Sequence, residues 1–307
     1  MLKEETTCPV CGSKRTEFQK KFRNNHPCFS NLQRMACLEC HLHFAHPMPK
    51  IEKLDDYNSS YHDSAHGGSK RDIKQQAFFT GLAKTRLAFI QENINLEKNY
   101  PYKILEIGPG PGAFVKVWMD TYEKSKYSVI ESDKSCYQDL KRLGVKIIKN
   151  DFDPLQENYD IIIISHVLEH VTDPNEFLNP FIKQLKKGGY LFIEVPCLDW
   201  RHKEIDEPHL LFFDKRSMSV LLNKLKLTKL KLAYYGIPHK HLLSFYRKFF
   251  KRLRGYLWRK GITYYHPEKK NISALVQNNH ETQSLLSFDA HKEQSECSWW
   301  LRVISKK

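Results

Sequence analysis

Residues 104–113 read ILEIGPGPGA, an apolar run that passes through one acidic residue into a glycine-rich turn. A strand that runs into such a turn and then into a helix lets the backbone approach a cofactor closely. These glycines would also fit a dinucleotide site. However, Glu106 would repel a diphosphate at the strand end, and Pro109 and Pro111 have no amide hydrogen to donate to one. The stretch therefore predicts a strand–turn–helix unit that holds a ligand carrying positive groups.

Two more predicted strands end in acidic residues. One ends at Glu131, where a carboxylate suits a ribose diol, and the next ends at Asp151, where a carboxylate suits an adenine amino group. The carboxyl ends of parallel strands meet at one edge of a sheet, so these residues and Glu106 would face the same cofactor. The alternative is that all three are solvated loop acids.

The residues around these motifs alternate between β-like and helical patterns. Apolar runs, with helical patterns between them, predict strands at 103–107, 127–130, 145–149, 161–164 and 190–195. Strands that alternate with helices form a parallel sheet with right-handed crossovers. The last of these helices is predicted over 174–187, ending at Gly188. A helix near 217–226 and strands near 228–234 and 298–304 follow.

Five motifs, in this order along the chain, resemble those of the class I S-adenosylmethionine-dependent methyltransferases: LEIGPGPG (105–112), VIE (129–131), ND (150–151), SHVLEHVTDP (165–174) and KGG (187–189). The resemblance covers about 72–235 and the final strand. It implies an α/β, Rossmann-like, doubly wound sheet of seven strands whose last strand, at 298–305, runs antiparallel. It also implies that S-adenosylmethionine is bound by Glu106, Gly108, Gly110, Gly112, Glu131, Asp151 and Ser165.

Four cysteines near the N-terminus form two CxxC pairs, Cys8 with Cys11 and Cys37 with Cys40. Each pair places two thiolates on a tight turn, and two such pairs make a closed tetrahedral zinc site, which suits a structural ion. The pattern predicts a small zinc-ribbon-like domain over residues 1–66, ahead of a cofactor-binding domain over 67–235. Four unrelated thiols are the alternative, and nearby histidines leave a His ligand open.

A zinc-binding N-terminus ahead of such a domain resembles a subgroup that methylates sugars, often nucleotide-linked, on carbon or oxygen. The sugar C-methyltransferases of that subgroup carry a longer C-terminal domain, for which we expect no room in this sequence. We therefore expect O-methylation of a sugar or glycoconjugate intermediate, as in polysaccharide biosynthesis. One rival is an RNA 2′-O-methyltransferase, although nucleic acid is the less favoured partner. A second rival is a non-catalytic zinc-ribbon adaptor with a degenerate methyltransferase fold.

Three histidines, His166, His170 and His209, are candidates for catalysis. The first two flank Glu169 at spacings that would place all three residues on one helical face, and His209 would fold over the same cleft. A neutral imidazole takes a proton from a sugar hydroxyl at neutral pH, and His209 is the first choice for this base. Alternatively, Glu169, His170 and His209 hold a divalent metal, as in the small-RNA 2′-O-methyltransferases that this layout resembles, or they only pack the loop.

Residues 236–297 form an insertion before the last strand, and its first part is basic and aromatic. Residues 239–260 contain no acid, and their apolar residues recur at helical spacing. Such a helix would contact an anionic membrane surface, cover the cleft as a lid, bind an RNA backbone, or simply pack on the core. The formal net charge of +14 favours an anionic partner of some kind.

The N-terminal residues contain no apolar stretch of the kind that forms a signal peptide, so we expect a cytoplasmic chain. The alternative is a chain attached peripherally to the inner face of the membrane. Cysteines persist as thiols in that compartment. We therefore expect all eight to be metal ligands or core residues and none to form a disulfide.

Overall fold

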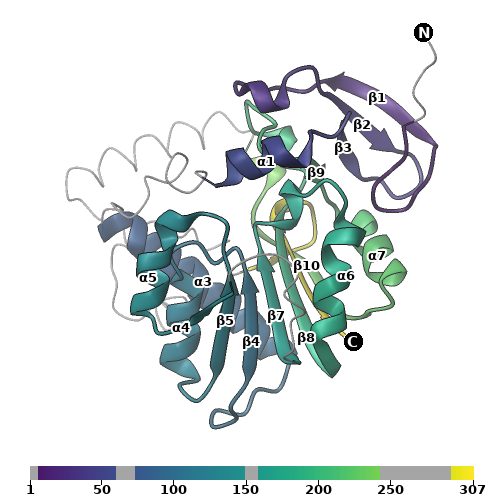
Figure 1. Cartoon of the computed structure of the whole chain (residues 1–307). Helices are drawn as coiled ribbons and strands as arrows, with labels where there is room; N and C mark the ends of the chain where they lie inside the picture. Colours follow the sequence, from purple (N-terminus) through teal and green to yellow (C-terminus); the bar gives the residue numbers. More distant parts are fainter. Residues whose placement is uncertain (1–5, 60–72, 149–157, 243–291) are drawn as a thin grey trace.

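The computed structural model describes residues 6–59, 73–148, 158–242 and 292–307, which form two sheets with helices around them (Figure 1). The larger sheet has eight strands in the order β11-β10-β12-β8-β7-β4-β5-β6. Their bounds are β4 Lys103–Ile107, β5 Lys126–Ile130, β6 Lys146–Ile147, β7 Tyr159–Ser165, β8 Leu185–Pro196, β10 Thr228–Pro238, β11 Glu293–Gln294 and β12 Ser298–Lys306. The smaller sheet has the order β1-β2-β3-β9, with β1 Thr16–Lys21, β2 Gln33–Cys37, β3 His43–His46 and β9 Leu211–Phe212.

Helices cover both faces of the larger sheet. The α-helices are α1 Ile51–Asn58, α3 Ile73–Asn93, α4 Ala113–Thr121, α5 Tyr137–Arg142, α6 Pro174–Gln184, α7 Lys215–Lys224 and α8 His239–Leu242. In β7, Ile161 and Ile163 pack in the core cluster that includes α3 and α4 residues, whereas Ile162 and Ile164 pack in the cluster that includes α6 and α7 residues. All four are fully buried, which explains why this strand has no polar alternation.

The α/β, doubly wound architecture predicted from the sequence is confirmed. Strands β4, β5, β6, β7 and β8 are parallel, and β12 runs antiparallel between β8 and β10. The sheet has one strand more than expected, because the two-residue β11 pairs with β10 at the edge. The helix expected over 174–187 ends at Gln184, since Leu185 already pairs with Tyr159 of β7.

The N-terminal module, defined here as residues 6–59, contributes three strands of the smaller sheet. The fourth strand, β9, comes from residues 211–212 and pairs with β3. The smaller sheet therefore combines residues from both sides of the boundary expected near residue 66, and it joins the module to the segment that follows β8.

The expectation that no cysteine forms a disulfide is wrong for two of the eight. Cys197, at the end of β8, and Cys297, just before β12, are disulfide-bonded across a sequence separation of 100 residues. The antiparallel pairing of β12 with β8 brings the two positions together, and the amide of Cys197 donates to the carbonyl of Trp299. No motif marks these two residues, because the pairing depends on strands distant in sequence.

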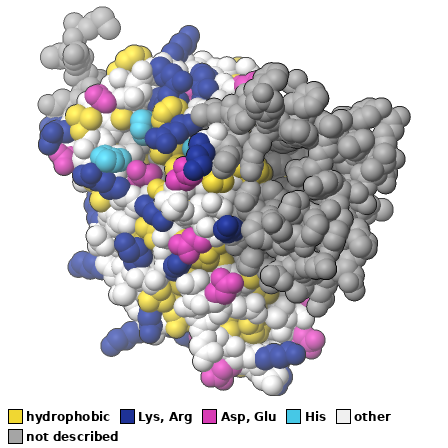
Figure 2. Space-filling model, turned by 180° about the vertical axis from the view of Figure 1, so that it is seen from behind, with side chains coloured by type: hydrophobic (Ala, Val, Ile, Leu, Met, Phe, Trp, Pro, Cys, Tyr) yellow, Lys and Arg dark blue, Asp and Glu magenta, His cyan; other side chains and the backbone are white. Residues whose placement is uncertain are grey.

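Within the described ranges, no helix combines the length and apolar character needed to cross a bilayer. On the face shown in Figure 2, Lys and Arg side chains are spread among acidic ones. The visible described residues therefore do not form a continuous basic stripe of the kind that follows a nucleic-acid backbone. Most of the predicted basic helix at 239–260 lies outside the described residues.

Candidate active site

The glycine-rich turn follows β4 at the carboxyl edge of the sheet and leads into α4. Gly108 has φ +68°, and a Cβ built there would overlap Cγ2 of Val167. Gly112 has φ +83° and immediately precedes α4, where a Cβ would lie 2.6 Å from a Leu143 methyl. Both positions therefore require glycine, because a side chain would be strained and would clash with its neighbours.

Glu131 follows β5 and lies against this turn. Its carboxylate accepts hydrogen bonds from the amides of Gly110 (2.8 Å) and Asp133 (2.9 Å), one to each oxygen. Burial raises the pKa of Glu131 despite these bonds. Each carboxylate oxygen retains a second acceptor position, so the residue is held in place and is still able to accept from a diol.

Glu106 lies within β4 and is almost completely buried. Its carboxylate accepts a hydrogen bond from the hydroxyl of Tyr127 on β5, at 2.8 Å. Burial raises the pKa of Glu106 to about 7, since the Tyr127 hydrogen bond offsets only part of the desolvation. The third acid predicted for the cofactor, Asp151, lies outside the described residues.

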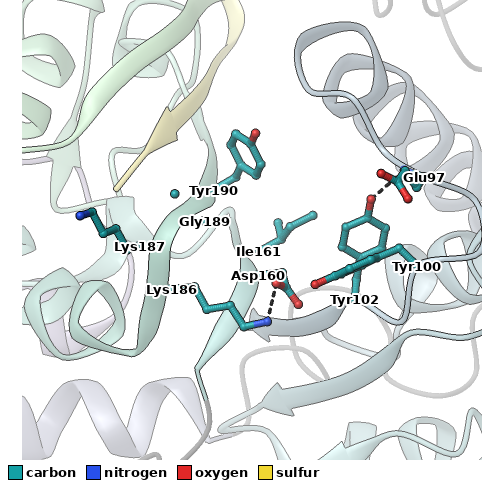
Figure 3. Close-up of a pocket in the computed structure, with 10 residues that line it drawn as sticks. Glu97, Tyr100, Tyr102, Asp160, Ile161, Lys186, Lys187, Gly189 and Tyr190 are labelled. Atoms are coloured by element: carbon teal, nitrogen blue, oxygen red, sulfur yellow. Dashed lines mark hydrogen bonds and ion pairs between the residues drawn. The ribbon is translucent and has the colours of Figure 1, made fainter.

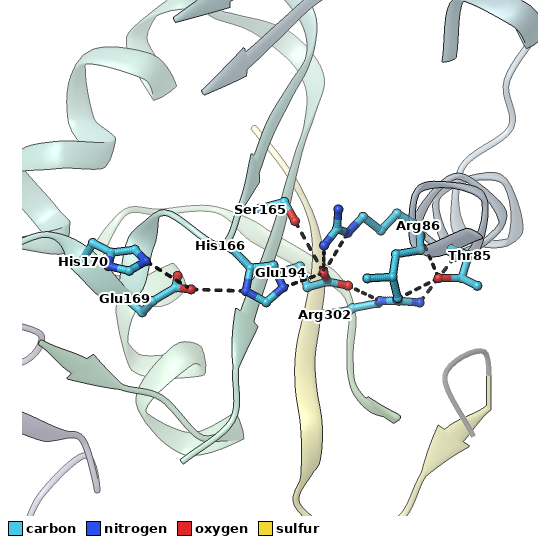
Figure 4. A network of polar contacts seen from close by, with 9 residues as sticks. Thr85, Arg86, Ser165, His166, Glu169, His170, Glu194 and Arg302 are labelled. Atoms are coloured by element: carbon cyan, nitrogen blue, oxygen red, sulfur yellow. Dashed lines mark hydrogen bonds and ion pairs between the residues drawn. The ribbon is translucent and has the colours of Figure 1, made fainter. Parts of the chain in front are cut away.

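His166 lies between two buried carboxylates at the end of β7 (Figure 4). Its Nδ1 is 3.3 Å from Glu169 and its Nε2 is 3.2 Å from Glu194. Burial alone would lower the pKa of His166, but the two carboxylates have the larger effect and raise it. Because both ring nitrogens already contact carboxylates, His166 is better suited to hold the loop than to act as a base.

Glu194, which the sequence did not reveal as a site residue, is buried and contacts several members of this network. It accepts from Arg302 of β12 (2.6 Å), from Arg86 of α3 (2.7 Å) and from the Ser165 hydroxyl (3.4 Å). Burial would raise the pKa of Glu194, but the two guanidinium groups hold it well below its usual range. No local pattern signals these contacts, because the partners lie on elements far apart in sequence.

The expected helical face that presents His166, Glu169 and His170 is not present. His166 has φ +57° and precedes a single 3-10 turn, Leu168–His170. The turn nevertheless brings the groups together, with Glu169 contacting His166 and lying 3.8 Å from Nε2 of His170. The cluster is therefore formed by a strained corner at the end of β7.

His209 lies beside His170, as the sequence predicted. The ring centroids are 4.9 Å apart in an edge-to-face arrangement, and His209 is 5% exposed. Burial lowers the pKa of His170 to about 4, so this ring is neutral and weakly basic. Glu169, His170 and His209 each offer one ligand atom, and these atoms lie within 4.8 Å of one another.

Asp199 is the second residue that the sequence interpretation missed. It follows β8, and its Oδ2 lies 2.8 Å from Nδ1 of His209 and 2.6 Å from the ammonium group of Lys203. Burial alone would raise the pKa of Asp199, but His209 and Lys203 lower it below its usual range. A weak signal was available, because Asp199 is an acid that follows the carboxyl end of a strand by three residues.

The four cysteines of the CxxC pairs converge in the N-terminal module. The Sγ atoms of Cys8 and Cys40 are 3.5 Å apart, as are those of Cys11 and Cys37, and all four lie within 4.8 Å of one another. Tetrahedral coordination with Zn–S bonds of about 2.3 Å places sulfurs about 3.8 Å apart. The cluster therefore fits a four-thiolate zinc site.

A cavity of about 210 Å³ lies at the opposite edge of the sheet, where β7 and β8 begin (Figure 3). It is lined by three tyrosines and by the ion pair between Asp160 and Lys186, whose charged atoms are 2.6 Å apart. Ligands of open α/β sheets bind at the carboxyl ends of the strands, so this cavity is not the cofactor site.

A family model described as "Methyltransferase domain" matches residues 78–253. The ubiquinone biosynthesis O-methyltransferases of Bartonella tribocorum and Bartonella quintana are each 30% identical to this chain, over 139 and 142 residues. These matches cover 38% and 39% of this chain and 54% and 55% of the relatives, so the chain spans about half the length of the curated relatives it matches.

Solved structures of methyltransferases are also similar. The plantazolicin methyltransferase BpumL, in complex with SAH, is 17% identical with a TM-score of 0.46, and the match covers 84% of this chain and 97% of that one. A possible histamine N-methyltransferase from Thermotoga maritima is 15% identical with a TM-score of 0.46, covering 76% and 91%. Since the family model spans more than half of the sequence, including the glycine-rich turn, the chain belongs to the methyltransferase domain family.

Proposed function

We propose that this protein is an S-adenosylmethionine-dependent methyltransferase that methylates a hydroxyl oxygen. The observation that carries the proposal is the buried contact between Asp199 and His209 at the carboxyl edge of the sheet. The names of the Bartonella relatives support oxygen as the acceptor atom.

The residues around the glycine-rich turn fit the cofactor. The turn brings the backbone close without side chains at Gly108 and Gly112, and Glu131 is positioned for the ribose hydroxyls. Glu106 lies in the adjoining strand, where its carboxyl group contacts the Tyr127 hydroxyl. A buried carboxylate favours a ligand with ammonium and sulfonium groups over a diphosphate. We assign Gly110, Ser165 and Asp151 to the same site on the basis of the motifs.

His209 is the proposed base. Nδ1 of His209 lies 2.8 Å from Oδ2 of Asp199. In the proposed role, this nitrogen keeps its proton on the side of the carboxylate and Nε2 accepts the proton of an acceptor hydroxyl. Asp199 stabilises the imidazolium that results, and buried, neutral His170 packs against the ring. S-adenosylmethionine, when bound, supplies an electrophilic methyl group. The protein then has to align the acceptor oxygen in line with that methyl group and exclude water.

For the acceptor we propose a sugar or glycoconjugate intermediate, including nucleotide-linked sugars. The support is the combination of a four-cysteine module with a methyltransferase domain, which resembles the sugar-modifying subgroup. The curated relatives support a different hydroxyl, that of a quinone precursor. A contact of residues 239–260 with an anionic membrane remains part of this proposal for lipid-linked acceptors.

For the four cysteines we propose one structural zinc ion. Their sulfurs are close enough to share an ion, and four thiolates fill a tetrahedral site without leaving an open position. The ion would tie the turn at Cys8 to the turn at Cys37, 29 residues later in the sequence.

A second candidate function is metal-assisted 2′-O-methylation of RNA, favoured by the convergence of Glu169, His170 and His209. A divalent ion bound there would polarise the acceptor hydroxyl directly, so His209 would act as a ligand and not as a base. The two functions differ in their response to a chelator.

The experiment that tests the proposal is a transfer assay with methyl-labelled S-adenosylmethionine. The acceptor panel contains nucleotide sugars, a lipid-linked sugar, catechols and a short RNA duplex, each with and without a chelator specific for weakly bound divalent ions. Label on a sugar hydroxyl in the presence of chelator supports the proposal. Label on RNA that disappears with chelator and returns with Mg²⁺ or Mn²⁺ supports the second candidate.

A further inference from the structure

Asp206 lies outside the proposed site, yet it is one of the most completely buried charges of the described residues. Its side chain is 0% exposed and accepts hydrogen bonds from the amide and Nε of Arg23, at 3.0 and 3.1 Å. A second guanidinium, that of Arg34 on β2, donates to the same carboxylate at 3.1 Å. Two cations of the N-terminal module therefore converge on one carboxylate of the methyltransferase domain.

Arg34 is also fixed by packing. Its side chain is 2% exposed, and its guanidinium carbon lies 4.0 Å from the centre of the Trp200 ring. Trp200 follows Asp199 directly, and its carbonyl accepts from Arg23. The same two arginines thus contact both the beginning and the end of the loop that runs from Asp199 to His209.

Backbone hydrogen bonds connect Asp206 to the proposed base. The amide of His209 donates to the carbonyl of Asp206, and the amide of Asp206 donates to the carbonyl of Arg23. The next residue, Leu210, donates to Glu169 and accepts from Ala45 of the N-terminal module. The loop is therefore held between the module and the corner that carries Glu169.

We propose that Asp206 is a positioning residue, through which the N-terminal module holds His209 against Asp199. The inference rests on the proposed role of His209 as the base. A displacement of about 1 Å of such a group reduces a rate by about 100-fold, so a loop of this kind needs support that its own sequence does not supply. The module would then be part of the active-site framework, in addition to any role in binding.

The test uses the full chain with Asp206→Asn, which keeps the shape of the side chain and removes its charge. A buried cation pair would then lack its counter-charge. We expect amide hydrogen exchange of His209 and Leu210 to accelerate by about 10- to 100-fold, with exchange in residues 104–112 unchanged. The proposed role places the ring proton of His209 on Nδ1 in the wild type, and we expect Asp206→Asn to weaken this preference, measured by ring nitrogen NMR.

The matched control is Asp160→Asn, which removes the charge of a carboxylate that is 15% exposed and pairs with Lys186 at the opposite edge of the sheet. It should change neither the His209 tautomer nor exchange at His209. Where Asp206→Asn does not fold, Arg23→Ala is used, because its side chain is 29% exposed and Arg34 still pairs with Asp206.

An unchanged His209 tautomer and unchanged local exchange in these variants would overturn the proposal, whatever happens to the melting temperature. Neither measurement needs an acceptor substrate. If Asp206→Asn loosens the loop but His209→Ala methylates an identified acceptor at the normal rate, the positioning contact exists and the proposed base is wrong. The two failures are thereby distinguished.

Discussion

The Nδ1 atom of His209 lies 2.8 Å from Oδ2 of Asp199, and both residues are buried. A carboxylate in this position fixes which ring nitrogen carries the proton and stabilises the imidazolium once the ring accepts a second one. Asp199 begins a 3-10 turn three residues after β8, whereas His209 precedes β9, so the contact spans the loop that the N-terminal module also holds.

Asp199→Asn should lower kcat of methyl transfer by about 10²–10⁴, because an amide cannot stabilise the imidazolium and favours the wrong tautomer. Cofactor affinity should not change, since Glu131 and the glycine-rich turn are separate from this contact. Single-turnover kinetics with an acceptor from the panel measure the effect. Lys203→Ala, which removes the exposed partner of Asp199, is the control and should retain most activity. Equal rates in the wild type and Asp199→Asn would contradict the assignment.

Glu131→Ala should weaken binding of S-adenosylhomocysteine by about 1.5–3 kcal/mol, the range for a hydrogen bond to a charged group. The carboxylate is held by Gly110 and Asp133, so it would reach a ribose diol without reorganisation. Isothermal titration calorimetry provides the measurement, with the exposed Glu123→Ala as a control. An affinity equal to that of the wild type would remove Glu131 from the site.

The protein should contain one zinc ion per chain when purified without chelator, bound by Cys8, Cys11, Cys37 and Cys40. Removal of the ion should increase hydrogen exchange in the N-terminal module and leave β4, β5 and β7 protected. Elemental analysis and exchange of the chelated protein test both parts. Cys28→Ser is the matched control, because this half-buried cysteine lies outside the cluster. Protein that is free of zinc and other metals yet fully protected in the module would contradict this assignment.

Glu106 gives a pH dependence of stability with a defined sign. Burial raises its pKa to about 7, so its contribution to stability is full below the ordinary value of 4.5 and is lost as the pH rises through about 7. Glu106→Gln has no such loss. The free energy of unfolding of this variant, relative to wild type, should therefore rise by about 3 kcal/mol between pH 4.5 and 7. Above pH 7 the difference should stay constant.

Urea denaturation at pH 5, 6, 7 and 8 measures this difference. The exposed Glu123→Gln serves as the control and should differ from the wild type by the same amount at every pH. A difference between Glu106→Gln and the wild type that does not vary with pH would show that Glu106 is not perturbed by burial.

Local patterns in the sequence were sufficient for the architecture. The isoleucine run at 161–164 indicates a strand that is covered on both faces. The turn at 108–112 favours glycine because a side chain at Gly108 or Gly112 would be strained and would clash with its neighbours. The convergence of the four cysteines also followed from spacing, since each CxxC pair determines the position of its own thiolates.

The contacts that complete the site were not predictable by the same means. Glu194 and Arg302 are 108 residues apart, and Arg23 and Asp206 are 183 residues apart. A buried carboxylate requires a cation, but the sequence does not say which of many arginines will be adjacent to it. The disulfide between Cys197 and Cys297 was missed for the same reason, because it depends on the register of β12 against β8.

The most direct test of the central claim is methyl transfer by His209→Ala, compared with the wild type, using methyl-labelled S-adenosylmethionine and the acceptor panel. The account predicts that the wild type labels a hydroxyl oxygen in the presence of chelator. It also predicts that His209→Ala does so with kcat lower by about 10²–10⁴ and with unchanged affinity for S-adenosylhomocysteine. Transfer by His209→Ala at the wild-type rate would contradict it, as would a wild-type protein that binds no S-adenosylhomocysteine.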